Sequence, residues 1–175
     1  MYNERQGGYG NRQTGYARTD SRDSKPKASP QSIVAEPLPG DYVKRAEEAI
    51  SELKRLEDQD RRKSVITTSK LRSLFSLFTE TYNAVSRGDQ EKLNQDQIND
   101  LNAAKVRIYY EIGREDRYNG HMDSAPVGRF VQQSKLLAYL DDISDSCEKL
   151  LHFYHYMEAL VAFHRFYFGE KKDRN

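Results

Sequence analysis

The stretch TTSKLRSLFSLFTETYNAVSRG, residues 67–88, decides the fold class of this chain. Apolar residues recur in it at steps of three and four, the spacing of one face of an α-helix. They are Leu71, Leu74, Phe75, Phe78, Tyr82 and Val85. Thr67 or Thr68 can cap the start of this pattern, and Gly88 ends it. The stretch therefore predicts one amphipathic helix whose apolar face packs against other elements.

The same spacing predicts four further helices on either side of this stretch. Their expected ranges are 41–57, 94–113, 124–146 and 148–168. Asp41 and Ser124 are expected as N-caps, and Pro126 falls in a first turn, where a helix tolerates it. No strand alternation and no hairpin dipeptide in context occurs. The sequence therefore predicts an all-α fold, a compact bundle of about five helices.

The last two stretches carry apolar residues on more than one side. In 124–146 two apolar sets lie nearly opposite one another; they are Val127, Phe130, Val131 and Ala138, and Leu136, Leu140, Ile143 and Cys147. In 148–168 a broad apolar face is extended by Tyr156, Phe163 and Phe166. Both segments need cover on several sides, either from the bundle itself or from another subunit.

The first 40 residues differ in composition from the rest. They hold five of the ten glycines and four of the five prolines, and they have no apolar periodicity. Such a segment cannot bury enough surface to offset the entropy of ordering. We expect a disordered Gly/Arg/Tyr-rich tail over residues 1–40 and a helical bundle domain over residues 41–175. The interleaved Tyr and Arg of the tail resemble loose RNA-binding segments, but a solvated linker is the simpler interpretation.

Charge, cysteine content and hydropathy limit the partners and the cellular compartment that the protein can have. Lys and Arg number 28 against 27 Asp and Glu, so bulk charge gives no affinity for nucleic acid. The single Cys147 excludes a disulfide framework. No apolar run approaches the ~20 residues that span a bilayer, and no signal peptide is visible. We expect a cytoplasmic protein without membrane contact.

Motifs for catalysis or cofactors do not occur in the sequence. The sequence contains neither the phosphate-binding pattern G-x-x-x-x-G-K-[ST] nor the pattern G-x-G-x-x-G after a strand. The spacing of His152 and His155 matches no metal-site signature, and His164 falls on an apolar side, where a hydrogen-bonded core histidine is usual. We expect no enzyme, no catalytic or metal-binding residue, no cofactor and no small-molecule substrate. A metal-dependent hydrolase built on His152 and His155 is the weakest hypothesis.

Positive charge gathers around the start of the 67–88 stretch. Residues 61–79 contain five Lys and Arg and no acidic residue. Lys70 falls in a first turn, at the positive end of the helix dipole, where it costs roughly a few tenths of a kcal/mol unless an anion is near. Free N–H groups, Thr hydroxyls and the Lys70 ammonium suit a phosphate. A solvated lysine beside an ordinary cap explains the pattern equally well.

Further basic residues occur in the third and fourth predicted helices. Arg107 and Arg114 are seven positions apart and share a helix face. Lys105 falls among apolar positions, where it must snorkel, pair or mark the edge of the core. Arg129 and Lys135 precede the acidic end of the fourth helix. This segregation indicates a basic stripe that contacts backbone phosphates, since no recognition helix or aromatic stacking motif stands out.

Four segments resemble a known family. They are TTSKLRSLFSLFTETYNAV, AAKVRIYYEIGRE, VGRFVQQSKLLAYLDDI and FYHYMEALVAFHRFYFG. In this order they are similar to the small subunit of the type III-A CRISPR-Cas interference complex, the Csm small-subunit family. The resemblance covers roughly residues 41–169, and its most specific parts are 67–72 and 157–168. The first 40 residues depart from the family pattern.

The resemblance implies a non-catalytic helical bundle that is present in several copies and stacks as a filament. Its implied partners are the guide RNA, the target RNA, the backbone subunits that cleave the target, and the large subunit with its DNase and cyclic-oligoadenylate activities. The implied phosphate contacts are Lys70, Arg72, Lys105, Arg107, Arg114 and Arg129. Lys135 is added from charge segregation alone.

Two functions are consistent with these patterns. The first is a non-catalytic RNA-binding subunit in antiviral defence, which contacts the backbone of the guide–target duplex without sequence specificity. The alternative is a structural helical adaptor whose apolar faces bind protein partners and whose basic residues only keep it soluble. Changes of basic residues weaken RNA binding only under the first hypothesis, whereas Phe163→Asp or Phe166→Asp disrupts association under the second.

Overall fold

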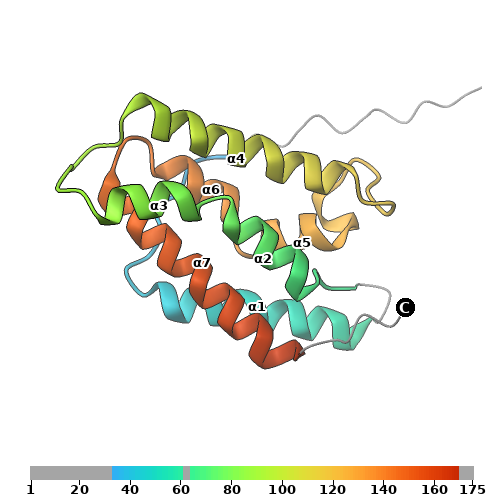
Figure 1. The fold of residues 1–175 in the computed structure, drawn as a ribbon. Coiled ribbons are helices and arrows are strands. Elements are labelled where there is room, and N and C mark those ends of the chain that lie inside the picture. Colours follow the sequence, from blue (N-terminus) through green and yellow to red (C-terminus); the bar gives the residue numbers. More distant parts are fainter. Residues whose placement is uncertain (1–32, 61–63, 170–175) are drawn as a thin grey trace, which may run out of the picture.

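The computed structural model describes residues 33–60 and 64–169, which fold into one helical bundle (Figure 1). Its helices are α1 (Tyr42–Gln59), α2 (Thr68–Ser76), α3 (Thr79–Ser86), α4 (Gln95–Gly113), the short 3-10 helix η1 (Met122–Ser124), α5 (Pro126–Gln133), α6 (Leu136–Asp142) and α7 (Cys147–Phe168). Because these described ranges contain helices and no β-strand, the predicted all-α bundle is confirmed. The disorder predicted for the tail falls, up to position 32, outside the described residues.

Helix α7 runs through the middle of the bundle, with α1 packed along it and α4 across the far side of the molecule (Figure 1). On α7, the side chains of Phe153, Tyr156, Met157 and Leu160 are at most 1 % exposed. The broad apolar face predicted for this segment is therefore covered mainly by the chain itself. Phe166, near the end of α7, is 80 % exposed and is not part of that core.

The stretch 67–88, predicted as one helix, forms α2 and α3. Between them, the N–H groups of Leu77 and Phe78 bond to carbonyls three residues back, as in a 3-10 turn. Neither proline nor glycine occurs at this break. The tighter turn accompanies the entry of Phe78 into the core, where its ring centroid lies 5.1 Å from that of Phe153 on α7. The predicted periodicity is correct, and packing against α7 divides the helix.

The stretch 124–146, also predicted as one helix, is divided into α5 and α6. The two helices meet at Lys135, whose φ of 51° lies in the left-handed region and redirects the chain. Val127, Phe130 and Val131 of the first apolar set lie on α5, whereas Leu136 and Leu140 of the second lie on α6, so most of the two opposite sides belongs to two short helices. Ala138 of the first set lies on α6, and Cys147 of the second begins α7. Phe130 of α5 and Leu136 of α6 are both fully buried.

The N-terminus of α5 is capped from a distant part of the chain. Ser124, the expected N-cap, lies one position too early, and Ala125 occupies the cap without a side-chain hydrogen bond. The carboxylate of Glu115, in the loop after α4, instead accepts the N–H of Val127 at 2.9 Å. A local cap motif could not reveal this arrangement, because the acceptor lies ten residues before the cap position.

Residues 33–40 belong to the predicted tail but contact the bundle. Ile33 and Leu38 are partly buried against the core, and the Glu36 N–H donates to the Ala138 carbonyl at 3.1 Å. Most of the aliphatic side chains of the first 40 residues are in this segment, which explains why it packs. The domain boundary at residue 41 stays a prediction. Among the described helices, none has the length and apolar content that a bilayer crossing requires.

Candidate nucleic-acid interface

One carboxylate gathers three basic side chains on the α4 side of the bundle. Glu111 of α4 is 5 % exposed. It forms ion pairs with Nζ of Lys70 at 2.5 Å, Nη2 of Arg107 at 2.9 Å and Nη1 of Arg114 at 3.6 Å. Lys70 reaches it from the first turn of α2, while the two arginines come from α4 and its C-cap. We call these four residues the Glu111 cluster. The prediction that Arg107 and Arg114 share a face is confirmed.

The Glu111 cluster combines three positive groups with one negative group, a formal charge of +2. The hydrogen bond from Lys70 is the largest reason why the pKa of Glu111 lies below its ordinary value; burial opposes it, and the charges of Lys70, Arg114 and Arg107 reinforce it. Glu111 is therefore ionised at neutral pH. The side chains of Arg107 and Arg114 are each 53 % exposed. Their guanidinium groups hold donors open to an incoming anion.

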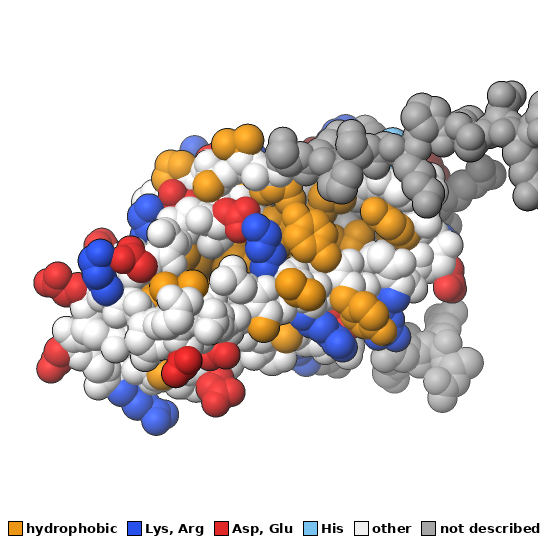
Figure 2. Space-filling model, turned by 90° about the horizontal axis from the view of Figure 1, so that it is seen from above, with side chains coloured by type: hydrophobic (Ala, Val, Ile, Leu, Met, Phe, Trp, Pro, Cys, Tyr) orange, Lys and Arg blue, Asp and Glu red, His pale blue; other side chains and the backbone are white. Residues whose placement is uncertain are grey.

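Beside the cluster, α4 presents an apolar face to solvent. Val106 lies opposite the buried face of the helix, with Tyr109 and Tyr110 to either side. Their exposed fractions are 68 %, 43 % and 56 %. We call these three residues the α4 outer face. The guanidinium carbons of Arg107 and Arg114 lie 5.0 and 5.8 Å from the ring centroid of Tyr110, within cation–π range. Figure 2, a view from the α4 side, shows hydrophobic and basic side chains adjacent on this surface.

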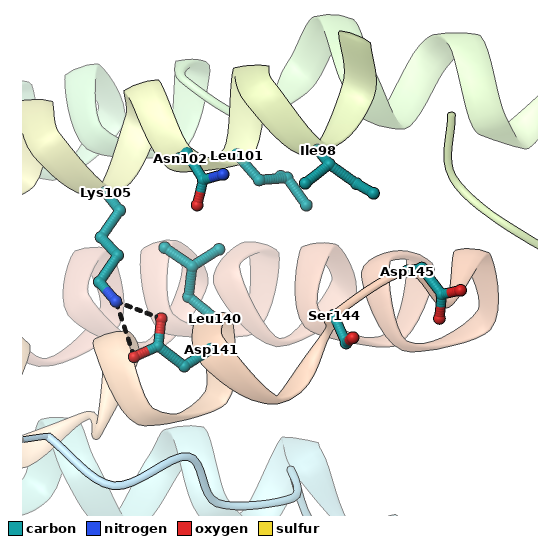
Figure 3. Close-up of a pocket in the computed structure, with 8 residues that line it drawn as sticks. All are labelled: Ile98, Leu101, Asn102, Lys105, Leu140, Asp141, Ser144 and Asp145. Atoms are coloured by element: carbon teal, nitrogen blue, oxygen red, sulfur yellow. Dashed lines mark hydrogen bonds and ion pairs between the residues drawn. The ribbon is translucent and has the colours of Figure 1, made fainter. Parts of the chain in front are cut away.

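Arg72 and Lys105 point away from the Glu111 cluster. Arg72 is exposed on α2, two positions after Lys70 and so roughly 200° around the helix. Lys105 lies on the other flank of α4, where Nζ contacts both carboxylate oxygens of Asp141 at 2.6 and 2.8 Å. This pair closes one end of a cavity of about 210 Å³ between α4 and α6 (Figure 3). Of the three alternatives for Lys105, pairing is the one that the structure realises.

Arg129 and Lys135 contact other parts of the chain. The guanidinium of Arg129, only 8 % exposed, donates to the carbonyl oxygens of Ser64 at 2.8 Å and Asp123 at 2.9 Å. Lys135 contacts both carboxylate oxygens of Glu36 at 2.7 and 2.8 Å. Of the seven predicted contact residues, the structure therefore brings three together, namely Lys70, Arg107 and Arg114.

At the start of α2, the side chains that the sequence suggested for a phosphate already have protein partners. The Thr67 hydroxyl accepts the Lys70 N–H at 3.2 Å as an ordinary N-cap. Thr68 Oγ1 faces Nδ1 of His164 at 3.4 Å. Because the Lys70 ammonium turns to Glu111, these donors point at separate protein partners. Lys70 is not a freely solvated lysine either.

The histidines of α7 have structural surroundings. His164 is 2 % exposed and its Nε2 lies 2.8 Å from the Ile66 carbonyl oxygen, which confirms the predicted core histidine. His152 packs edge-on against an aromatic ring of α1, and Nδ1 of His155 lies 2.8 Å from the Glu158 carboxylate. In the part of the chain that the structure describes, no three His, Cys, Asp or Glu side chains are grouped to hold a metal ion.

Sequence patterns alone do not single out Glu111 or the α4 outer face. Glu111 looks like an ordinary helix-surface acid, although it lies four positions after Arg107 and three before Arg114, a spacing that predicts contact with both. Tyr109 and Tyr110 belong to no apolar stripe in the sequence. Their angular position, away from the stripe that contains Leu101 and Ile108, is the available signal for exposure.

Comparison with known proteins identifies the family. The model of the family described as Csm2 Type III-A matches residues 41–170. The CRISPR system Cms protein Csm2 of Streptococcus thermophilus is 35 % identical over 129 residues, which cover 74 % of this chain and 93 % of that protein. Its namesake from Mycobacterium tuberculosis (strain CDC 1551 / Oshkosh) is 32 % identical over 126 residues, 72 % of this chain and 90 % of that one. The protein of the same name from Enterococcus italicus is 32 % identical over 127 residues, which cover 70 % of this chain and 86 % of that protein. The chain therefore belongs to the Csm2 family, the small subunit of the type III-A CRISPR Csm complex.

Proposed function

We propose that this subunit is a non-catalytic RNA-binding protein that contacts the phosphates of the guide–target duplex without reading its sequence, and that several copies stack as a filament. As a member of the Csm2 family, the chain is a subunit of the Csm complex with other Csm subunits and the CRISPR RNA, and this family is generally non-catalytic. Arg107 and Arg114 are the central contacts in this proposal, Lys70 adds its charge to theirs while paired with Glu111, and Arg72 is a peripheral contact.

The Glu111 cluster is the observation that supports this proposal. Two half-exposed guanidinium groups from positions seven residues apart on one helix face converge on the same oxygen, Oε1 of Glu111, at 2.9 and 3.6 Å. Arginine suits phosphate because its planar fork donates two parallel hydrogen bonds. Glu111 holds both arginines in place, so less conformational entropy is lost on binding. Phosphate contacts of this kind position a strand and carry no sequence information.

The other predicted contacts have a lesser part in the proposal. Lys105, Arg129 and Lys135 already have partners within the chain, two carboxylates and a pair of carbonyls. Recruitment of any of them by RNA requires that an existing interaction be broken. The proposed interface therefore centres on the arginine side of α4.

The test is the double variant Arg107→Gln/Arg114→Gln, which leaves the Lys70–Glu111 ion pair intact. We expect weaker binding to unrelated RNA sequences in equal proportion. The slope of log affinity against log salt concentration falls by about one to two units, because each phosphate contact contributes roughly 0.7 to 0.9. Titration of labelled RNAs at several salt concentrations measures both quantities.

The matched control is Lys44→Gln/Arg55→Gln. It removes the same charge from α1, on the far side of the bundle from α4 (Figure 1). We expect this control to bind RNA nearly as well as the wild-type chain. The proposal is contradicted if both double variants lose RNA affinity equally, or if affinity falls for one RNA sequence only.

The adaptor function is the second candidate, and the exposure of Phe166 favours it. Under this function, Phe166→Asp prevents incorporation into the complex while Arg107→Gln/Arg114→Gln leaves both incorporation and RNA protection unchanged. Co-purification of each variant with the assembled complex separates the two functions.

A further inference from the structure

The α4 outer face is not explained by contacts to phosphates. Seven large hydrophobic side chains are exposed among the described residues, and three of them, Val106, Tyr109 and Tyr110, lie together on this face. The opposite side of α4 is already buried in the core through Leu101 and Ile108. A helix of a monomeric bundle needs only one apolar side, so a second one indicates a binding surface.

The surroundings of Tyr110 are cationic. From position 101 to 114, α4 and its C-cap contain Lys105, Arg107 and Arg114 but only one acidic residue, the nearly buried Glu111. Both arginines approach the Tyr110 ring while leaving more than half of the residue exposed. An occupant of this surface must therefore combine a flat apolar group with negative charge a few ångströms away.

We infer that Tyr110, with Val106 and Tyr109 beside it, is a stacking site for an unpaired RNA base, and that Arg107 and Arg114 hold the phosphates of the same strand. This inference rests on the proposed function and adds a preference for unpaired nucleotides. A nucleotide carries an aromatic base and a phosphate at the required separation, and base–tyrosine stacking tolerates any base. Paired bases cannot use the site, because their faces are stacked within the duplex.

A second copy of the chain related by two-fold symmetry is a less suitable occupant of the same surface. An isologous contact through the α4 outer face would bring Arg107 and Arg114 of both copies close to one another. Like charges at such a distance repel, and the single carboxylate of each cluster is already paired three times. The charge of the surface therefore favours an anion.

The experiment compares Tyr110→Leu with Tyr110→Phe in the full chain. The probes are a labelled single-stranded 12-nucleotide RNA, its blunt duplex, and the same strand with abasic riboses in place of its nucleotides. We expect Tyr110→Leu to bind the single strand on the order of tenfold more weakly, because stacking of one base contributes that much. Tyr110→Phe keeps the aromatic ring and binds within about twofold of wild type. Neither variant changes binding of the duplex or the abasic strand.

Phe166→Leu is the matched control, because it also removes an exposed aromatic ring, at the end of α7. It leaves all three affinities unchanged. The inference is overturned if Tyr110→Leu binds the single strand normally, or if it loses affinity for the abasic strand equally. It is also overturned if Tyr110→Leu alters the oligomeric state without RNA, which indicates a protein contact. If Arg107→Gln/Arg114→Gln weakens binding of the single strand and Tyr110→Leu does not, this inference alone is overturned and the proposed function stands.

Discussion

Lys70 and Glu111, far apart in the sequence, form an ion pair of 2.5 Å that joins the first turn of α2 to the last turn of α4. The pair explains why a lysine is placed at the positive end of a helix dipole. An anion is needed there, and the chain supplies it as a carboxylate. The same carboxylate orients Arg107 and Arg114, so one residue links the packing of two helices to the charge of the surface.

Replacement of Glu111 with Gln is expected to change stability and RNA binding in opposite directions. The three cations lose their shared anion, and the free energy of unfolding falls by about 1 to 2 kcal/mol, as for hydrogen bonds to charged groups. RNA binding at low salt becomes tighter, because no carboxylate competes with phosphate for the cations. Urea denaturation and RNA titration measure the two effects.

The control for this prediction is Asp100→Asn, which makes the same charge change at an exposed position of α4. It should alter stability by less than about 0.5 kcal/mol. A folded Glu111→Gln protein that binds RNA more weakly than Asp100→Asn contradicts the competition argument. In that case the carboxylate orients the arginines more than it occupies them.

The pH dependence of stability should also reflect the ion pairs of Glu111. The pKa of Glu111 is lower in the folded chain than its ordinary value of 4.5. Its ion pairs therefore stabilise the fold fully above pH 4.5, and this stabilisation is lost as the pH falls through the depressed value. We expect the difference in unfolding free energy between wild type and Glu111→Gln to be constant near neutral pH and to shrink in acid. Denaturation curves across this range check it, and a difference that grows below pH 4.5 contradicts it.

The helices are predictable from the sequence wherever local rules decide them. The Asp41 and Asn94 caps follow from side chains that act within one turn, and α7 ends at Gly169, where the φ of 62° favours glycine. The breaks at Leu77 and at Lys135 are not predictable, because no proline or glycine marks them. They depend on how the residues that follow pack against other helices, and one sequence does not contain that information in local form.

The candidate site is predictable only in part, for a related reason. Helical spacing places Arg107 and Arg114 together, since both lie on one helix. The approach of Lys70 to Glu111 depends on how α2 and α4 cross, and the partners of Arg129 are two backbone carbonyls that no side-chain pattern marks. A count of basic residues therefore overestimates the interface.

Arg129→Ala is expected to reduce stability and to leave the RNA affinity of the folded protein unchanged. The substitution removes both donors from the carbonyl oxygens of Ser64 and Asp123, at a cost of about 1 to 3 kcal/mol. Arg72→Ala, an exposed cation of α2, serves as the control and should not change stability. Thermal unfolding and RNA titration on the same samples test this. Normal stability with weakened RNA binding in Arg129→Ala would instead identify Arg129 as an RNA contact.

Gly128→Ala is expected to destabilise the junction of η1 and α5. A Cβ at this position would lie 2.0 Å from the carbonyl oxygen of Met122, so the backbone must shift. Overpacking of this kind costs about 1 to 3 kcal/mol or more. Gly113→Ala is the matched control, because a Cβ at that position would have no neighbouring atom within 4 Å and alanine favours helix. The melting temperature of Gly113→Ala should equal or exceed that of wild type. If Gly128→Ala has the same melting temperature as Gly113→Ala, the close approach between position 128 and the Met122 carbonyl is contradicted.

Glu115→Ala is expected to loosen the start of α5, because the Glu115 carboxylate is the acceptor for the Val127 N–H. Loss of a helix cap costs about 1 kcal/mol. The effect should be local: amide hydrogen exchange should accelerate at Val127 and Gly128 before it does in α7. Burial raises the pKa of Glu115, so protonation of this carboxyl favours the folded chain. The unfolding free energy that Glu115→Ala removes should therefore be larger in mild acid than at neutral pH. Asp116→Ala, which removes the neighbouring exposed carboxylate, should leave exchange at both amides unchanged. Uniform acceleration across the bundle in Glu115→Ala would contradict a local cap, since it would mean that Glu115 supports the whole fold.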